Sequence, residues 1–162
     1  MTTVTAPTTD RIEEQVLLHA PRARVWRALT EPQELGAWFG VRFGDDVVIA
    51  PGAVVRGKIT NPGYEHVTWE VTVDEVVPES RFSWRWHPYA VDPAFDYSQE
   101  PTTLCTFTLE DAPDGGTRLT LVESGFDALS PERRAAGLQM NGKGWTSQLQ
   151  RRIPDYLART GA

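Results

Sequence analysis

Residues 66–86, HVTWEVTVDEVVPESRFSWRW, carry the pattern that decides the fold. On both sides of Pro78-Glu79-Ser80, apolar residues recur at every second position, a period that predicts half-buried β-strands. The link between the two runs is short, and a link of hairpin length joins antiparallel neighbours. The hairpin therefore places large residues on one face of an antiparallel sheet: Val67, Trp69, Val71 and Val73 from its first strand, and Phe82, Trp84 and Trp86 from its second.

The same period continues along the chain outside this hairpin. Residues 112–116 (APDGG) contain Asp-Gly and Gly-Gly, which tolerate the positive φ of a tight turn. Another turn signal, Asn61-Pro62-Gly63, precedes the first strand of the hairpin. We expect an antiparallel, meandering sheet with further strands over residues 11–18, 53–60, 103–110 and 117–123.

Two short helices are predicted after the first strand. Pro21 suits the first position of a helix because its missing N–H would have no partner there, and Val25 and Leu29 form an apolar stripe. Residues 30–33 (TEPQ) have the pattern of a capping box. They predict a second short helix, whose inner side carries Leu35, Trp38 and Phe39.

A long helix is predicted near the C-terminal end of the sequence. Ser130 and Pro131 are typical of an N-cap and a first helical position. Pro154 should kink or locally unwind this helix, because proline has no N–H to donate. One apolar stripe runs along it at spacings of 7, 4, 4 and 3: Leu138, Trp145, Leu149, Ile153 and Tyr156.

Length and composition predict one domain. With 162 residues and 40% apolar content, we expect a disordered tail over residues 1–10 and a single domain over residues 11–162. No apolar run approaches the roughly 18 residues of a membrane helix, so we expect no membrane span and a cytoplasmic location. The net charge of −6 argues against a nucleic-acid partner, because binding to phosphates relies on clustered Lys and Arg.

Aromatic content is the unusual feature of this composition. Six tryptophans exceed what close packing of a small core normally requires, and large aromatic faces suit either a core or an apolar ligand. Residues 87–101 are too long for a hairpin turn and contain three prolines, so we expect a binding loop at the mouth of a cavity. The candidate ligand-binding residues are Trp38, Phe39, Trp69, Trp84, Trp86, Phe107, Met140 and Trp145.

Polar groups give only weak candidates for catalysis. His87 ends the aromatic strand where the proposed loop begins, whereas alternation turns Glu70 away from the Trp69 face. Glu123 lies within a strand, and if it points inward it becomes a polar anchor for a ligand or an acid-base group. The histidines have no metal-like spacing with each other or with Cys105, which we expect to be a small buried side chain. We therefore predict no metal and no cofactor.

The sequence resembles a known group of proteins over roughly residues 11–158. It is similar to the START-like, Bet v 1-type (SRPBCC) superfamily, and within it to the domain related to the C-terminal part of the activator of Hsp90 ATPase. The resemblance implies an α+β helix-grip fold, in which a curved sheet of six to seven antiparallel strands and two short helices enclose a cavity with a long C-terminal helix. The matching pieces are Ala20-Pro21, 25–30 (VWRALT), Pro32, 38–40 (WFG), 73–86 (VDEVVPESRFSWRW), 116–121 (GTRLTL), Gly125-Phe126 and 144–157.

The resemblance implies function less directly, because this scaffold hosts lipid carriers, hormone receptors, aromatic cyclases and co-chaperone domains. The leading hypothesis is non-catalytic binding of a small hydrophobic or aromatic molecule between the sheet and the C-terminal helix. The alternatives are a small cyclase- or hydrolase-type enzyme using the same cavity, and a module that interacts with a chaperone. Larger co-chaperones of the family carry an additional N-terminal domain that this sequence does not contain, so we expect no stimulation of Hsp90. A homodimer through the sheet edge or the loop stays open.

Overall fold

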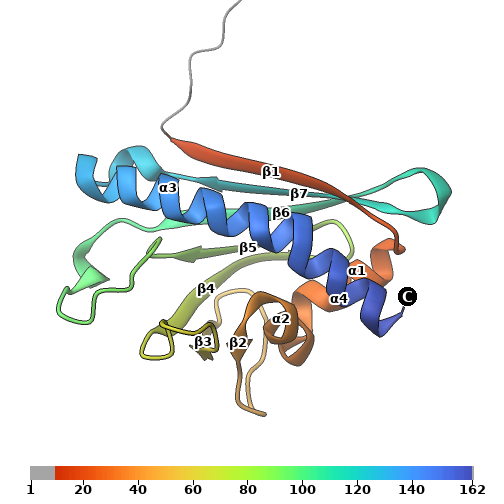
Figure 1. The fold of residues 1–162 in the computed structure, drawn as a ribbon, viewed down its shortest axis with the longest axis horizontal. Coiled ribbons are helices and arrows are strands. Elements are labelled where there is room, and N and C mark those ends of the chain that lie inside the picture. Colours follow the sequence, from red (N-terminus) through yellow and green to blue (C-terminus); the bar gives the residue numbers. More distant parts are fainter. Residues whose placement is uncertain (1–9, 162) are drawn as a thin grey trace, which may run out of the picture.

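The computed structural model describes residues 10–161 and contains a curved seven-stranded antiparallel sheet (Figure 1). The strand order is β1-β7-β6-β5-β4-β3-β2, so only the first strand departs from a meander, by pairing with the last one. The predicted tail lies, apart from Asp10, outside the described residues. The strands are β1 Arg11–Leu18, β2 Val41–Arg42, β3 Val54–Ile59, β4 Thr68–Val77, β5 Arg81–Trp86, β6 Thr103–Asp111 and β7 Thr117–Ser124.

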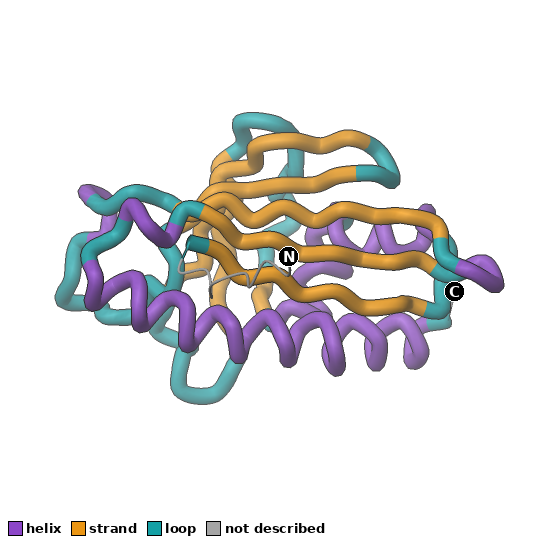
Figure 2. The backbone as a smooth tube through the Cα atoms, turned by 90° about the horizontal axis from the view of Figure 1, so that it is seen from above, coloured by secondary structure: helices purple, strands orange, loops and turns teal. Residues whose placement is uncertain are grey.

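Helices cover one face of this sheet, and the C-terminal helix runs along it (Figures 1 and 2). This arrangement confirms the predicted α+β helix-grip class. Three short 3₁₀ turns, Tyr97–Gln99, Pro113–Gly115 and Phe126–Ala128, lie in the connections. The longer helical elements are α1 Arg22–Thr30, α2 Pro32–Phe39, α3 Pro131–Ser147, a π-helical turn over Gln148–Arg152, and α4 Ile153–Thr160.

The hairpin that decides the fold forms as predicted, with β4 starting two residues later than expected. Val73 of β4 pairs with Trp84 of β5, which in turn pairs with Cys105 of β6. Trp84 and Cys105 have no exposed surface, so the inward face of the hairpin is continuous with the centre of the core. The alternation in the sequence thus reports correctly which face is buried.

The starts of the two short helices differ from the predictions. Pro21 is the N-cap of α1, one position before the helix, and its carbonyl accepts hydrogen bonds from the N–H groups of Arg24 and Val25. The capping box does not form, because Thr30 is still the last residue of α1. Its hydroxyl donates at 2.8 Å to the carbonyl of Trp26 in the preceding turn, and Glu31 becomes the N-cap of α2.

The irregularity predicted at Pro154 takes the form of a π-helical turn just before it. The N–H of Ile153 bonds to the carbonyl of Gln148, five residues back instead of four. This wider turn shifts the backbone hydrogen-bond register just before Pro154, which has no N–H to donate. Trp145, Leu149 and Ile153 all stay buried on one side, so the apolar stripe continues through the irregularity.

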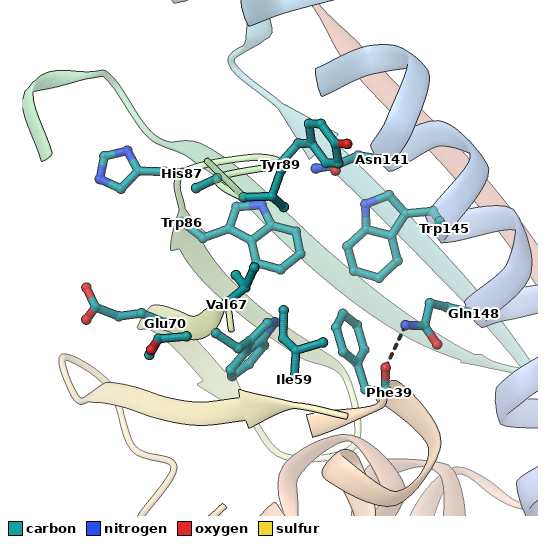
Figure 3. A pocket seen from close by; sticks show the side chains of 15 residues that line it. Phe39, Ile59, Val67, Glu70, Trp86, His87, Tyr89, Asn141, Trp145 and Gln148 are labelled. Carbon is teal, nitrogen blue, oxygen red and sulfur yellow. Dashed lines mark hydrogen bonds between the residues drawn. The ribbon is translucent and has the colours of Figure 1, made fainter. Parts of the chain in front are cut away.

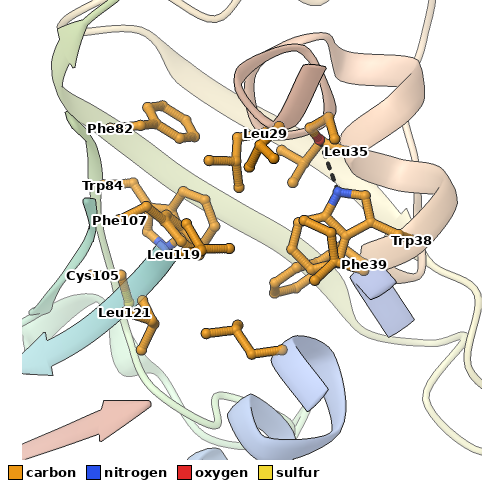
Figure 4. Packing of buried hydrophobic residues seen from close by; sticks show 14 of the residues in the cluster. Leu29, Leu35, Trp38, Phe39, Phe82, Trp84, Cys105, Phe107, Leu119 and Leu121 are labelled. Atoms are coloured by element: carbon orange, nitrogen blue, oxygen red, sulfur yellow. Dashed lines mark hydrogen bonds between the residues drawn. The ribbon is translucent and has the colours of Figure 1, made fainter. Parts of the chain in front are cut away.

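Aromatic and aliphatic side chains fill the space between the sheet and α1 and α2 (Figure 4). Trp38 lies between the two short helices, 2% exposed, and its indole Nε1 donates at 2.8 Å to the carbonyl of Ala28. Phe82, Trp84 and Phe107 extend the packing across β5 and β6, with ring centroids 5.2–6.3 Å apart. This part of the aromatic excess is core.

Glu34 on α2 joins three helices. Its carboxylate pairs with Arg24 at 2.9 Å and Arg27 at 2.8 Å, both on α1, and accepts a hydrogen bond at 2.7 Å from the hydroxyl of Tyr156 on α4. Burial opposes the charged form and raises the pKa of Glu34, but the Tyr156 hydrogen bond and the two guanidinium groups outweigh it and lower the pKa overall.

We expect the contribution of Glu34 to the free energy of unfolding to decrease as the pH falls into the acid range. A carboxyl whose pKa is lower in the folded than in the unfolded protein stabilises fully above its ordinary value of 4.5, and this contribution is lost as pH falls through the folded pKa. Urea unfolding of the wild type and Glu34→Gln from neutral to acid pH should therefore give midpoints that differ most at neutral pH and converge in acid. Glu110→Gln, at an exposed position, is the control. A difference that does not change with pH would contradict the assignment.

Candidate ligand pocket

A pocket of about 250 Å³ lies between the sheet and the C-terminal helix (Figure 3). Its walls come from the end of α2, from β3, β4 and β5, from α3 and the π-helical turn, and from the loop after β5. Small-molecule sites of this kind are mostly apolar with a few polar groups. The lining residues are Phe39, Ile59, Val67, Thr68, Trp69, Glu70, Trp86, His87, Tyr89, Ala90, Val91, Asn141, Gly144, Trp145 and Gln148.

Four aromatic rings form the inner wall. The ring of Phe39 lies edge-on to Trp69, Trp86 and Trp145, with centroid distances of 5.7, 6.4 and 5.7 Å. Trp86 and Trp145 face each other at 5.9 Å with their planes tilted by 36°. Each ring belongs to a different element, α2, β4, β5 or α3, so this wall exists only in the folded chain.

The structure brings together half of the predicted ligand-binding residues. Phe39, Trp69, Trp86 and Trp145 line the pocket. Trp84 and Phe107 lie one layer deeper, with no exposed surface, and pack against the ring of Trp145 from below. Trp38 and Met140 are also outside the lining; Trp38 packs between α1 and α2, and Met140 is partly buried on α3.

Glu123 on β7 points inward and has no exposed surface. Its Oε2 accepts hydrogen bonds from Trp86 Nε1 at 2.8 Å and Thr103 Oγ1 at 2.6 Å, and its Oε1 accepts one from Trp145 Nε1 at 2.8 Å. Asn141 Nδ2 lies 3.1 and 3.2 Å from the two oxygens. The carboxylate therefore lies directly behind the pocket wall, where it links β5, β6 and α3.

The other two polar candidates lie at the rim. Glu70 lines the pocket from the exposed side of β4, where its side chain is 50% exposed and pairs with Arg56 at 2.5 Å. His87 is partly buried, and its imidazole points away from the Trp86–Trp145 pair in Figure 3. Within residues 10–161, neither makes a hydrogen bond or an ion pair with Glu123, so the structure does not bring the three candidates together.

Several polar atoms of the lining have no partner. Within residues 10–161, Trp69 Nε1, His87 Nδ1 and Gln148 Oε1 are buried without a hydrogen bond. The amide nitrogen of Gln148 is used, because it donates at 2.9 Å to the carbonyl of Phe39. Two further buried atoms without a hydrogen bond, Arg24 Nη1 and Trp84 Nε1, belong to residues outside the lining, so such atoms are not confined to the pocket.

The loop expected at the cavity mouth does line the pocket, through Tyr89, Ala90 and Val91. Arg133 on α3 holds this loop in place. Its guanidinium donates to the carbonyls of Pro88 and Tyr89 and pairs with Glu100 at 2.9 Å. The same group lies 4.8 Å from the centre of the Tyr97 ring. The loop is therefore fastened to the C-terminal helix at both of its ends.

Cys105 is buried, as predicted from its place in an alternating run. Burial and the neighbouring carboxylate of Glu123 raise the pKa of the Cys105 thiol well above its usual range. A thiol in this state is a poor nucleophile. Within the part of the chain that the structure describes, no group of His, Cys, Asp and Glu side chains could hold a metal ion, and no helix has the length and apolar character needed to cross a membrane.

Sequence reasoning missed the polar side of the pocket. Asn141, Gly144 and Gln148 lie on one face of the C-terminal helix, spaced by three and four residues, beside the predicted Trp145. The position of Glu123 could have been found from period alone. Leu119, Leu121 and Glu123 alternate along β7 and share its buried face.

Comparison with known proteins agrees with this architecture. A family model described as Activator of Hsp90 ATPase homolog 1-like protein matches residues 19–158. None of the curated proteins matches the sequence. Among solved structures, protein MLL2253 from Mesorhizobium loti is 28% identical with a TM-score of 0.68, covering 94% of this chain and 99% of its own.

Two more distant structures share the fold. Protein NE0264 from Nitrosomonas europaea is 22% identical with a TM-score of 0.71, covering 98% of this chain and 100% of its own. The Aha1 dimer from Colwellia psychrerythraea is 17% identical with a TM-score of 0.60, covering 86% of this chain and 90% of its own. At these identities the likeness bears on the fold alone.

Proposed function

Because the chain belongs to the family of Activator of Hsp90 ATPase homolog 1-like proteins, whose fold commonly binds hydrophobic ligands, we propose that it is a non-catalytic carrier or sensor of a small aromatic molecule. The observation that carries this proposal is the pocket of about 250 Å³ walled by Phe39, Trp69, Trp86 and Trp145. Its size suits a compact ligand, below the range of about 300–1,000 Å³ for drug-sized sites. Apolar walls supply affinity in such a pocket, and polar lining residues such as Asn141 and Gln148 would orient the ligand.

Two glycines on α3 allow a matched test of this proposal. Gly144 lines the pocket and Gly142 does not, and a Cβ at either position would meet nothing within 4 Å. Gly144→Phe should place a ring in the pocket, whereas Gly142→Phe should leave the pocket open at a similar cost to the helix. We expect the first variant to lose at least about tenfold in affinity for 1-naphthalenemethanol, equivalent to about 1.4 kcal/mol, and the second to bind like the wild type.

Isothermal titration calorimetry with this neutral bicyclic probe gives the affinities, and thermal unfolding followed by circular dichroism checks the fold. At 100 times its dissociation constant the probe should stabilise the wild type by about 2.7 kcal/mol. Equal binding by the two phenylalanine variants, or no binding by the wild type across a panel of naphthalene derivatives, would contradict the proposal.

The two alternatives receive less support from the site. An enzyme of the cyclase or hydrolase type would use His87 or an inward glutamate that can reach a substrate. Both oxygens of Glu123 already accept hydrogen bonds, Glu70 is paired with Arg56, and the imidazole of His87 points away from the two indoles (Figure 3). A chaperone-interacting role rests on the family name alone. We expect the chain by itself to leave the ATPase rate of Hsp90 unchanged in a coupled assay.

A further inference from the structure

A buried carboxyl group, that of Glu123, lies behind the aromatic wall of the pocket. Glu123 has no exposed surface, and within residues 10–161 no Lys, Arg or His makes an ion pair with it. Its hydrogen-bond partners are neutral groups, Trp86, Thr103, Asn141 and Trp145. A shell of neutral donors stabilises a carboxylate without cancelling its net charge.

The identity of these donors indicates which form of Glu123 the site is built for. An indole N–H can only donate, and two of them, from Trp86 and Trp145, point at the two oxygens. The side-chain NH₂ of Asn141 also donates, so a carboxylate can accept from all four partners at once, whereas a carboxylic acid could give its own proton only to the Thr103 hydroxyl, 2.6 Å from Oε2. The arrangement therefore suits the ionised side chain.

The same two indoles connect Glu123 with the pocket. Both side chains contribute to the lining, and Trp86 is the more exposed of the two, since Trp145 is only 2% exposed. Each indole therefore joins the buried carboxylate, through its N–H, to the pocket wall. Hydrogen bonds in a low-dielectric interior polarise the groups that make them, and donation to an anion pushes electron density into the donor ring. The faces of Trp86 and Trp145 are then better partners for a cation than unpaired indoles would be.

The pocket lining offers little positive charge to an anionic ligand. The lining of the pocket contains no Lys or Arg, and the one acidic residue at the rim, Glu70, is half-exposed and paired with Arg56. His87 is the only lining residue that could carry a positive charge, and its imidazole points away from the two indoles (Figure 3). An anionic ligand would thus enter a pocket with no counter-charge, which is costly in a poorly hydrated site.

We propose that the pocket selects its ligand by charge, and that it is built for an aromatic compound carrying an ammonium group in preference to its carboxylate analogue. The inference deepens the proposed function, since it rests on binding of a small aromatic molecule at this site. A cation–π contact with Trp86, which is partly exposed in the pocket wall, and the field of Glu123 favour the cation together.

The test uses three probes with one ring system: 1-naphthylmethylamine as the cation, 1-naphthalenemethanol as the neutral compound and 1-naphthoic acid as the anion. Titration calorimetry at mildly alkaline pH, where an ordinary histidine is neutral, gives their affinities for the wild-type protein. We expect the cation to bind at least about tenfold more tightly than the anion, with the neutral compound between them. Equal affinities, or tighter binding of the anion, would overturn the proposal.

Salt and two variants assign the preference to Glu123. Salt screens the field of an exposed charge such as Glu70 strongly, but it screens the field of a buried charge such as Glu123 only weakly. The preference for the cation should therefore persist in high salt, and it should also persist in Glu70→Gln. The ratio of the affinities for the cation and the anion should become smaller in Glu123→Gln. If that variant does not fold, the salt dependence of this ratio in the wild type tests whether a buried charge causes the preference. A preference lost in high salt or in Glu70→Gln would overturn the role of Glu123. If none of the probes binds, the proposed function itself fails; if all bind alike, only the charge selection fails.

Discussion

Replacing Glu123 by alanine is expected to lower the free energy of unfolding by about 3–5 kcal/mol, the largest effect of any single change at the pocket. The variant would leave the donors of Trp86, Thr103, Asn141 and Trp145 without an acceptor around a position that has no exposed surface. An unsatisfied buried donor costs about 1–3 kcal/mol, and relaxation of the side chains should recover part of the sum. Urea unfolding followed by circular dichroism measures the loss.

Glu70→Ala is the matched control for this prediction. It removes the same side chain from a strand of the same sheet, but at a half-exposed position with one ion pair, to Arg56. Exposed pairs contribute little, so we expect a change of about 0.5 kcal/mol or less. If Glu123→Ala were equally mild, the carboxylate would not be the fastening point between sheet and helix that its contacts indicate.

Gly36→Ala should also destabilise the protein strongly, by about 3 kcal/mol or more. A Cβ added at Gly36 would lie 2.1 Å from the carbonyl oxygen of Val41 and 3.2 Å from the ring of Phe43. The close atom belongs to the backbone, at the point where the chain reverses through Gly40 with φ of 96° to start β2. Neither α2 nor β2 can move away without opening the core beneath them.

Gly142→Ala provides the comparison, because it makes the same substitution in a helix where a Cβ meets nothing within 4 Å. Alanine favours the helix over glycine by about 1 kcal/mol, so this variant should be as stable as the wild type or more so. Thermal and urea unfolding of both variants would settle the point. Similar losses in the two would mean that helix propensity, and not the approach of α2 to β2, governs Gly36.

The hairpin over residues 66–86 shows how much of the fold follows from local pattern. Its turn, its aromatic face and its period of two appear in the structure, because alternation is a property of each strand by itself; the period is interrupted only by a register shift between Val73 and Val76. The apolar spacing of the C-terminal helix is equally local, and it survives the π-helical turn that accommodates Pro154. The capping box predicted at Thr30 does not form, because Thr30 belongs to the last turn of α1 and its hydroxyl bonds within that helix. Where α1 ends depends on more than the local pattern.

For the pocket, the sequence by itself determined that large aromatic residues gather on one face, and that a long helix with one apolar stripe is there to cover them. Only the tertiary structure decided which of those rings remain free to line a cavity, because Trp84 and Trp86 differ in depth by their neighbours and not by their period. It also decided the role of Glu123, whose donors lie 18 to 37 residues away along the chain. A buried charge is acceptable only where such donors converge, and convergence of distant segments is a property of the folded chain that no local pattern encodes.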